Sequence, residues 1–538
     1  MSIPFSCAAV FGDHMILQRD KPAAVWGTAP AGSRITASLA QAWETGSSCC
    51  STVEAETQSD AQGSWALDLS PQQAGGPWTI TLTCIQAAGK VCGPSCASHS
   101  PKIIQFVDVF FGEVWLAGGQ SNMELALQDC ENGPAELAVC KDDALRFYRV
   151  PRCAVADETL DTAEKAARWQ TADPAFFREV SAVAYFFARR LRAALGVPVG
   201  ILDCCWGGTS VSCWQSRAQL ERTTAGQGYL SRYDALCAGK SDAEYDAEMA
   251  EYFSNYNAWQ NRVAERRAAE PNVTWEILNR DCGLCPWPQP AGRKSPFRPA
   301  GLYETMLCRA APYTLTGFLW YQGEEDVAHC EEYAVLLSTL TEDWRARWGD
   351  VSLPFLAVQL PMYISQTDAK AIDPLLFARQ REQQQLAADS ISDFFLTVLT
   401  DCGEFDNIHP LDKQTVGARL AACGLRHAYG LEIAADSPRV AEVIWEETGV
   451  TVRFSGCRMM NSKGPVSGFT AAQPDGSFAA AQAQQTGPLT FFLPFVSGGR
   501  PYRAVRYAFF DYGVASLFSE AGLPASPWRS DAPPSFSM

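Results

Sequence analysis

The sequence predicts an α/β protein with a mostly parallel sheet, flanked at both ends by β-rich segments. Three observations support this fold class. Short apolar runs broken by Gly, Pro, Asp and Asn fill residues 5–105, apolar runs alternate with helix-like stretches in the middle, and short strand-like runs return after about residue 431. Regularly spaced short runs are typical of β-sandwiches, whereas apolar strands alternating with helices are typical of parallel sheets. We therefore expect domains at residues 1–105, 106–430 and 431–538.

The N-terminal segment contains runs such as AAVWG, SRITASLA and WALDLS, separated by turn residues at all-β spacing. This pattern predicts a β-sandwich. It is followed by VDVFFGEVWLAGG, residues 107–119, a continuous apolar run that predicts a strand buried on both faces. A helix-like stretch begins after Ser121, so we expect the chain to enter the α/β layer there.

The middle segment continues the alternation. SAVAYFFARRLRAALG predicts a helix, and VPVGILDCCW, TLTGFLWY and LPFLAVQL predict buried strands of the parallel sheet. Residues 216–299 interrupt this order with a charged helix-like stretch and a Pro-rich loop, which we interpret as an insertion or lid that borders the site. After about residue 431, RVAEVIWEE and GVTVRFSG predict the strands of a second β domain.

Composition excludes some functions. The chain has 538 residues, 47% of them hydrophobic, and a formal net charge of −17. A nucleic-acid partner is not expected, because phosphate binding needs a concentrated basic surface.

The N-terminus lacks the charged and apolar regions of a signal peptide, and no apolar stretch is long enough to cross a membrane. We therefore expect a cytoplasmic protein without a membrane partner, although a processed secreted form would begin in the same way. The oligomeric state stays open.

Twenty cysteines are scattered through the chain, many within apolar runs. Buried, reduced thiols explain this distribution. Cys282 and Cys285 form one C-x-x-C pair, but no second pair stands at zinc-ligand spacing, so two loop cysteines are favoured over a metal site or a disulfide. The function of this pair stays open.

Ser121 is the candidate nucleophile. It stands in GGQSNME, directly after a buried strand, where Gly118 and Gly119 permit a sharp turn and the start of a helix presents free backbone N–H groups. The alternative is a serine that only caps a helix.

His409 is the candidate general base, one of only five histidines. It follows Asp406 by three residues in FDNIHP, a spacing at which a carboxylate can orient an imidazole toward a serine. A solvated loop histidine is the alternative.

Two further motifs follow predicted strands and offer donors for an oxyanion. WGGTSVSCW contains Gly208, whose backbone N–H can approach a ligand because no Cβ intervenes, and WYQGEED contains Gln322, whose amide can donate. An ordinary glycine turn and a capping glutamine are the alternatives.

Substrate-binding candidates are less specific. Glu324 is expected near the end of the Gln322 strand, either accepting hydrogen bonds there or as a solvated carboxylate. Arg381 and Arg506 are candidates for binding a sugar carboxylate, although such arginines also form buried ion pairs. The sequence contains no H-E-x-x-H motif, P-loop or GxGxxG motif, so we expect no metal and no cofactor.

GGQSNME, WGGTSVSCW, WYQGEED and DNIHP, in this order, resemble the sialate O-acetylesterase family within the SGNH hydrolases. The resemblance extends to FGDHMILQRDKPAAVWG near the start and GLPASPWRSD near the end. It implies a flavodoxin-like, three-layer catalytic domain, with Ser121 as nucleophile, His409 as base and Asp406 as its orienting acid. It also implies three oxyanion donors: the backbone N–H groups of Ser121 and Gly208 and the side chain of Gln322.

The implied activity is hydrolysis of an O-acetyl ester of sialic acid, most readily the 9-O-acetyl ester, through a serine acyl-enzyme. Two alternatives remain. An acetylesterase for another acetylated carbohydrate, such as xylan, would use the same residues, because these motifs do not encode the glycan. A non-catalytic carbohydrate-binding protein would explain the flanking β segments and the many aromatic residues, but not the Ser, Asp and His set.

Overall fold

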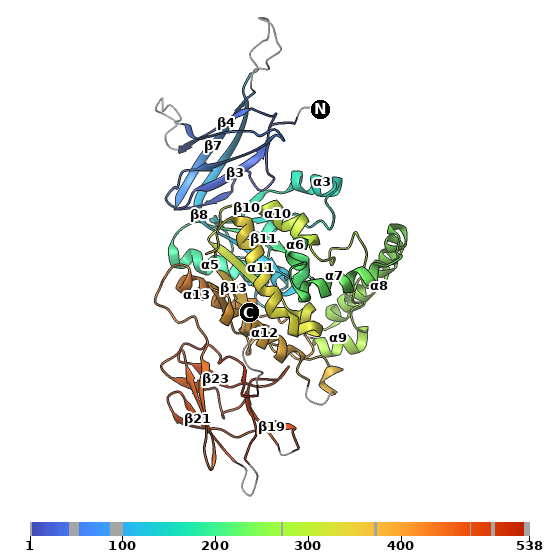
Figure 1. Cartoon of the computed structure of the whole chain (residues 1–538), viewed down its shortest axis with the longest axis vertical. Helices are drawn as coiled ribbons and strands as arrows, with labels where there is room; N and C mark the ends of the chain where they lie inside the picture. The colour runs from blue at the N-terminus through green and yellow to red at the C-terminus, as the bar shows by residue number, and fades with distance from the viewer. Residues whose placement is uncertain are drawn as a thin grey trace, which may run out of the picture.

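The computed structural model describes residues 3–41, 53–86, 100–270, 273–370, 374–473, 475–495 and 501–531. Figure 1 shows the strands of the N-terminal and C-terminal segments at opposite ends of the long axis, with a central sheet and most helices between them. Sheets and helices thus occur together in a mixed α/β fold, as predicted. None of the described helices is both long enough and apolar enough to cross a membrane.

The N-terminal segment folds into antiparallel strands. Three form one sheet in the order β1-β3-β6, and three others lead through the order β5-β4-β7 to the long strand β8. Side chains in β6 alternate between exposed and buried, and those facing inward share one core with the strands of the other group. The bounds are β1 Ser6–Cys7, β3 Ala23–Thr28, β4 Arg34–Gln41, β5 Val53–Gln58, β6 Ser64–Leu69, β7 Gly75–Ile85 and β8 Lys102–Gly119.

Strand β8 joins this segment to the central sheet. Its first half pairs antiparallel with β7, and β2 (Ile16–Gln18) lies parallel to its middle. Its second half pairs in parallel with β11 on one side and β12 on the other. A single continuous strand therefore belongs to both parts of the molecule, and the boundary expected after residue 105 lies within it.

The central sheet has the strand order β10-β9-β11-β8-β12-β13-β14. The pairings from β9 to β14 are parallel, and β10 is antiparallel to β9. Every residue of β11 and β12 is buried, which explains why their sequences are largely apolar. The bounds are β9 Asp142–Arg149, β10 Trp169–Ala172, β11 Val199–Cys205, β12 Gly317–Tyr321, β13 Phe355–Val358 and β14 Phe394–Thr397.

Helices cover both faces of this sheet. Residues of α5 (Ala182–Leu195) and α13 (Lys413–His427) share a core with Leu319 of β12. Residues of α11 (Tyr333–Trp348) share a different core with Trp320, whose side chain points to the opposite face. Helix α12 (Leu376–Ser390) packs beside α11.

Four helices stand between β11 and β12, within residues 216–299. They are α6 Arg217–Leu220, α7 Thr224–Cys237, α8 Asp242–Ala269 and α9 Trp275–Cys282. Helix α8 is capped by Ser241, whose side chain accepts from the backbone N–H of Glu244 while Glu244 accepts from the N–H of Ser241. In Figure 1 these helices extend to one side of the central sheet.

The C-terminal segment is built from short antiparallel strands in the orders β15-β16-β21-β20 and β19-β18-β22-β24, with β17 paired to β23. They enclose a core that includes Val452, Phe469, Phe491 and Tyr507. The bounds are β15 Arg439–Trp445, β16 Gly449–Ser455, β17 Met460–Ser462, β18 Phe469–Ala472, β19 Phe478–Ala480, β20 Gln484–Gly487, β21 Thr490–Pro494, β22 Val505–Tyr507, β23 Leu517–Ser519 and β24 Trp528–Arg529.

The remaining elements are short. They are α1 Ser121–Glu124, η2 Leu127–Asp129, α2 Gly133–Leu137, α3 Glu158–Ala166, α4 Pro174–Phe177, η3 Val211–Trp214, η4 Tyr303–Leu307, α10 Cys308–Ala310, η5 Glu324–Glu332 and η6 Asp368–Lys370. The described cysteines, Cys282 and Cys285 among them, form no disulfide.

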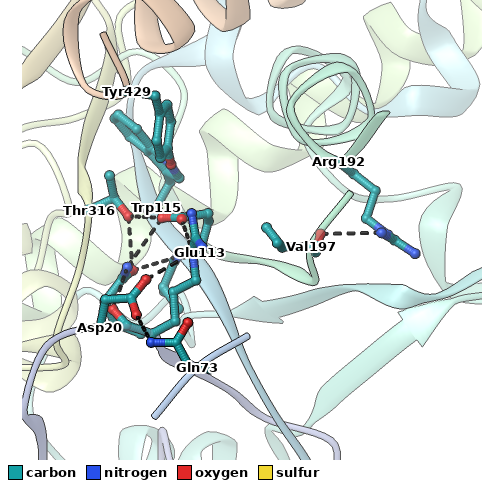
Figure 2. A network of polar contacts seen from close by, with 11 residues as sticks. Asp20, Gln73, Glu113, Trp115, Arg192, Val197, Thr316 and Tyr429 are labelled. Atoms are coloured by element: carbon teal, nitrogen blue, oxygen red, sulfur yellow. Dashed lines mark hydrogen bonds and ion pairs between the residues drawn. The ribbon is translucent and has the colours of Figure 1, made fainter. Parts of the chain in front are cut away.

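A buried carboxylate holds β8 where it enters the central sheet. Glu113 is 2% exposed and accepts hydrogen bonds from Arg19 Nε at 2.5 Å and Thr316 Oγ1 at 2.6 Å. The side-chain amide of Gln18 also donates to it, at 3.2 Å. Figure 2 shows Glu113 at the centre of this network, close to the hydrogen bond from the Trp115 indole to Tyr429. One carboxylate therefore links the N-terminal segment, β8 and the start of β12.

Replacing this carboxylate tests its contribution to stability. In Glu113→Ala, the Nε of Arg19 loses its acceptor and Thr316 keeps only Gln18 Oε1, and we expect the free energy of unfolding in urea to fall by about 2–4 kcal/mol. As a control, Glu56→Gln removes an ion pair with Arg34 in which both side chains are about half exposed, and it should leave the urea midpoint unchanged. Equal effects of the two substitutions would contradict this role of Glu113.

Candidate active site

The three polar motifs lie at one edge of the central sheet. Gly119, the last residue of β8, is in register with Cys205 at the end of β11 and with Tyr321 at the end of β12. All three strands are parallel, so the residues that follow them emerge at the same carboxyl edge. Ser121, Gly208 and Gln322 are each only one to three residues beyond these strand ends.

A sharp turn places Ser121 at the first position of α1. Gly119 has φ +138°, and a Cβ at this residue would lie 2.2 Å from the carbonyl oxygen of Tyr321. Only glycine fits such a close approach of two chains. The Oγ of Ser121 lies 2.8 Å from Nε2 of His409, in the loop between β14 and α13. The structure thus brings together two residues that are 288 positions apart in the sequence.

His409 is held as a neutral imidazole. Burial, and to a lesser extent the positive charge of Lys413, lower its pKa to about 4. Its backbone is fixed by Asn407, whose side chain accepts from the N–H of His409 and donates to its carbonyl oxygen, both at 3.0 Å. A neutral imidazole whose Nε2 lies beside a serine hydroxyl can accept the hydroxyl proton.

Asp406 lies on the same loop but contacts other residues. Its carboxylate accepts from Asn279 Nδ2 at 3.1 Å and from Gln366, through the backbone N–H at 3.1 Å and the side-chain amide at 2.6 Å. Within the described residues, no hydrogen bond or ion pair joins Asp406 to His409. Asp406 therefore ties the loop to α9 and to the segment that contains Gln366.

Gln322 and Gly208 have different surroundings at the edge. Gln322 is fully buried, and its amide donates to Gln120 Oε1 at 3.0 Å and to Thr209 O at 3.1 Å. Gly208 has φ +71°, and a Cβ there would meet the ring of Trp287 at 2.1 Å. Trp287 comes from the Pro-rich loop, and the sequence analysis did not select it. The indole ring therefore lies directly against Gly208, while the Gln322 amide points into the interior.

The neighbouring Gly207 also lies close to the serine. A Cβ at Gly207 would be 3.3 Å from Cβ of Ser121, and its backbone N–H donates to the carboxylate of Glu124. Glu124 in turn forms an ion pair with Arg152. These contacts fix the turn after β11 against α1.

A buried polar network lies beside Ser121. Asn122 donates from Nδ2 to Glu324 Oε1 at 2.6 Å and to the carbonyl oxygen of Ile408 at 2.9 Å, and its Oδ1 accepts from Lys413 Nζ at 2.6 Å. Burial lowers the pKa of Lys413 to about 8 and raises the pKa of Glu324. Because Ile408 precedes His409, Asn122 holds the histidine loop against the helix that begins with Ser121.

Sequence reasoning did not select Asn122 or Lys413, and it considered Glu324 only as a candidate near the substrate. One signal for Lys413 was present: it is the first residue of α13, where a positive charge opposes the helix dipole. Its position therefore needs a local partner, which the network supplies.

The two arginines considered for carboxylate binding are both buried. Arg381 is 0% exposed on α12 and donates to the carbonyl oxygens of Pro361 and Phe510. Burial lowers its pKa to about 10. Arg506 is 6% exposed and donates to Asp531 at 2.7 Å. Arg381 therefore fastens α12 to the C-terminal segment, and Arg506 pairs within that segment.

A cavity of 640 Å³ lies beside His409. One wall is the loop from Asp406 to His409, and much of the rest comes from α8 and α9 of the inserted helices. The volume is in the range of small-molecule sites. The inserted helices therefore line the cavity that also contains His409 in its wall.

Comparison with known proteins agrees with these features. Residues 283–422 match a family model described as "Carbohydrate esterase, sialic acid-specific acetylesterase". The sialate O-acetylesterase of Mus musculus is 26% identical over 448 residues, which are 80% of this chain and 74% of the mouse protein. The Homo sapiens sialate O-acetylesterase is 24% identical over 80% of this chain and 72% of its own length.

A solved structure resembles nearly the whole chain. A carbohydrate acetylesterase from Xanthomonas citri superposes with a TM-score of 0.73 and 26% identity, covering 98% of this chain and 99% of its own. The protein is therefore an ester hydrolase of the carbohydrate esterase class. Within that class, the resemblance of its motifs to the sialate O-acetylesterase family is confirmed.

The buried network beside Ser121 gives a stability prediction. Asn122→Leu keeps the side-chain volume but removes every hydrogen bond of the amide, which leaves Lys413 buried without an acceptor. We expect the free energy of unfolding to fall by about 3 kcal/mol, as measured in urea. Asn132→Leu is the control, since the amide of Asn132 is exposed and makes only a 3.4 Å contact with Gln414. If Asn122→Leu unfolds at the same urea concentration as Asn132→Leu, the network does not stabilise the fold.

Proposed function

We propose that the protein is a sialate O-acetylesterase that releases acetate from O-acetylated sialic acid, the 9-O-acetyl ester being the preferred substrate. The observation that carries this proposal is the 2.8 Å distance from Ser121 Oγ to His409 Nε2, beside a cavity large enough for a sugar. The family match and the named relatives support the choice of an acetylated sialic acid.

The reaction proceeds in two steps. His409 Nε2 takes the proton of Ser121 Oγ while Oγ bonds to the acetyl carbon, and the tetrahedral intermediate then expels the sugar oxygen, which receives that proton. In the second step His409 deprotonates a water molecule, which attacks the acyl-enzyme. Acetate leaves, and the proton returns to Ser121.

The oxyanion is stabilised by backbone donors. Ser121 is the first residue of α1, so its N–H has no acceptor within the helix. Gly208 lies at the same edge with a left-handed backbone that only glycine adopts readily. We propose Gln322 as the third donor, reached when its amide exchanges the bond to Thr209 for one to the oxyanion.

Asp406 has the role of orienting His409 through the loop. Its three hydrogen bonds to Asn279 and Gln366 fix the backbone three residues before the imidazole. Glu324 also helps to fix the histidine loop, because it accepts a hydrogen bond from Asn122, which holds that loop. Arg381 is not assigned to the substrate, since it is 0% exposed and both of its terminal nitrogens donate to buried carbonyl oxygens.

We also propose that residues 106–430 form an SGNH-type, flavodoxin-like, three-layer catalytic domain. The parallel pairings from β9 to β14 and the helical cores on both faces of the sheet support this assignment. Residues 1–105 and 431–538 are β domains that brace this unit from its two ends.

A second candidate substrate keeps the same chemistry. The Xanthomonas citri structure, which covers 98% of this chain, is named only as a carbohydrate acetylesterase. An acetylated neutral polysaccharide such as xylan is therefore the alternative, and a direct comparison of substrates separates the two.

Acetate release tests the nucleophile and the substrate together. Ser121→Ala should lower kcat at least about a thousandfold on 9-O-acetylated sialic acid and on an aryl acetate, because no other group can form the acyl-enzyme. Ser352→Ala, at an exposed serine that bonds only to Asp350, should match the wild type. Wild-type activity in folded Ser121→Ala would contradict the assignment. A preference for acetylated xylan would keep the mechanism and replace the substrate.

The lowered pKa of His409 sets the pH dependence. Because burial disfavours the imidazolium, the neutral base predominates above about pH 4 rather than above 6.5. We expect kcat/KM to stay high through pH 5 and to fall as the pH drops through about 4. Lys413→Met removes a neighbouring positive charge and should move this acid limb to higher pH. An acid limb centred near 6.5 in the wild type would contradict the buried, neutral base.

A further inference from the structure

The cavity beside His409 has an aromatic wall. Tyr256 and Trp259 of α8 and Trp275 of α9 line it, and Tyr363 lines it from another segment. The rings of Tyr256 and Trp259 are 5.8 Å apart, so they form a continuous surface. Aromatic faces of this kind bind the C–H face of a sugar ring while its hydroxyl groups remain free for hydrogen bonds.

Arg267 adds a positive charge to the same wall. Its guanidinium carbon lies 4.6 Å from the centre of the Trp275 ring, so the cation is stacked on the indole. Trp275 and Arg267 both line the cavity together with His409. A stacked guanidinium keeps its edge free, and that edge has the geometry for a bidentate bond to a carboxylate.

The charge of Arg267 has no partner in the described part of the chain, where it forms no ion pair. The preceding residue differs: Arg266 pairs with Glu270 at 2.8 Å and with Asp281 at 3.1 Å. The carboxylate of Asp406, which also lines the cavity, is engaged by Asn279 and Gln366. Asp129, which does not line the cavity, interacts electrostatically with Arg267 but forms no ion pair with it.

From these contacts we propose that Arg267, stacked on Trp275, binds the carboxylate of an acidic O-acetylated sugar and selects it over neutral acetylated glycans. This inference rests on the proposed function and names the residue that recognises the acid. In an acidic nine-carbon sugar, the carboxylate and the terminal acetyl ester are at opposite ends of the molecule. The cation that binds the carboxylate is therefore expected on the cavity wall formed by the inserted helices, away from the turn after β8 that carries Ser121.

The experiment compares 9-O-acetylated sialic acid with its methyl ester, which has the same acetyl group but no negative charge. In Arg267→Gln we expect KM for the free acid to rise about 10- to 100-fold, the range that a charge-assisted hydrogen-bonded pair supplies. KM for the methyl ester and kcat/KM for an aryl acetate should stay at wild-type values. Arg280→Gln is the matched control, since Arg280 is an exposed arginine on α9 that does not line the cavity.

Two results would overturn the proposal. One is an unchanged KM of Arg267→Gln for the free acid. The other is an equal rise for acid and methyl ester, which would indicate a general distortion of the cavity. Failure of the proposed function would give a different result, because it would be seen in the wild type. The wild type would then release no acetate from either sialic acid substrate while it hydrolyses acetylated xylan. Full aryl acetate turnover by Arg267→Gln shows that the variant is folded.

Discussion

Strand β8 is the constraint on which the rest of the structure depends. Its 18 residues pair with β7 in the N-terminal segment and then with β11 and β12 in the central sheet. Glu113 fixes the point of entry, and Gly119 ends the strand where no side chain other than hydrogen fits. The register of three parallel strands is thereby set at one edge, and the residues after each strand are brought together without further adjustment. The position of Ser121 is a consequence of this register.

Much of this arrangement could be predicted from the positions of the strands in the sequence. Continuous apolar runs identified the buried strands, and polar motifs at their ends identified the edge at which Ser121 and His409 meet. The contacts of individual side chains were not predictable in the same way. Asp406 bonds to Asn279 and Gln366, each at least 40 positions distant, and no local pattern reveals that partnership. Gln322 likewise turns toward Gln120 and Thr209 because both lie beside it in the folded interior.

Arg381 and Arg267 illustrate the same limit for charged residues. Both arginines are on helices, and the sequence analysis selected Arg381 but not Arg267 as a binder of an acid. Folding places Arg381 under the C-terminal segment, where carbonyl oxygens take its donors, and leaves Arg267 on a cavity wall with its charge unpaired among the described residues. Burial and pairing, which depend on the tertiary structure, decide which cation can meet a ligand.

The electrostatics around Ser121 favour a base that is neutral and a loop that is rigid. One buried network contains Lys413, Asn122 and Glu324, and its hydrogen bond from Asn122 to Ile408 holds the histidine loop. The positive charge of Lys413 also disfavours a positive charge on His409. Stability and chemistry therefore depend on the same contacts.

The central claim is that Ser121 is the activated nucleophile, and covalent labelling tests it most directly. The wild-type protein would be treated with a fluorophosphonate, digested and examined by mass spectrometry. We predict one phosphonylated peptide, the one that contains Ser121, and much slower labelling in His409→Ala. An adduct on a different serine, or labelling at an unchanged rate without His409, would contradict the account.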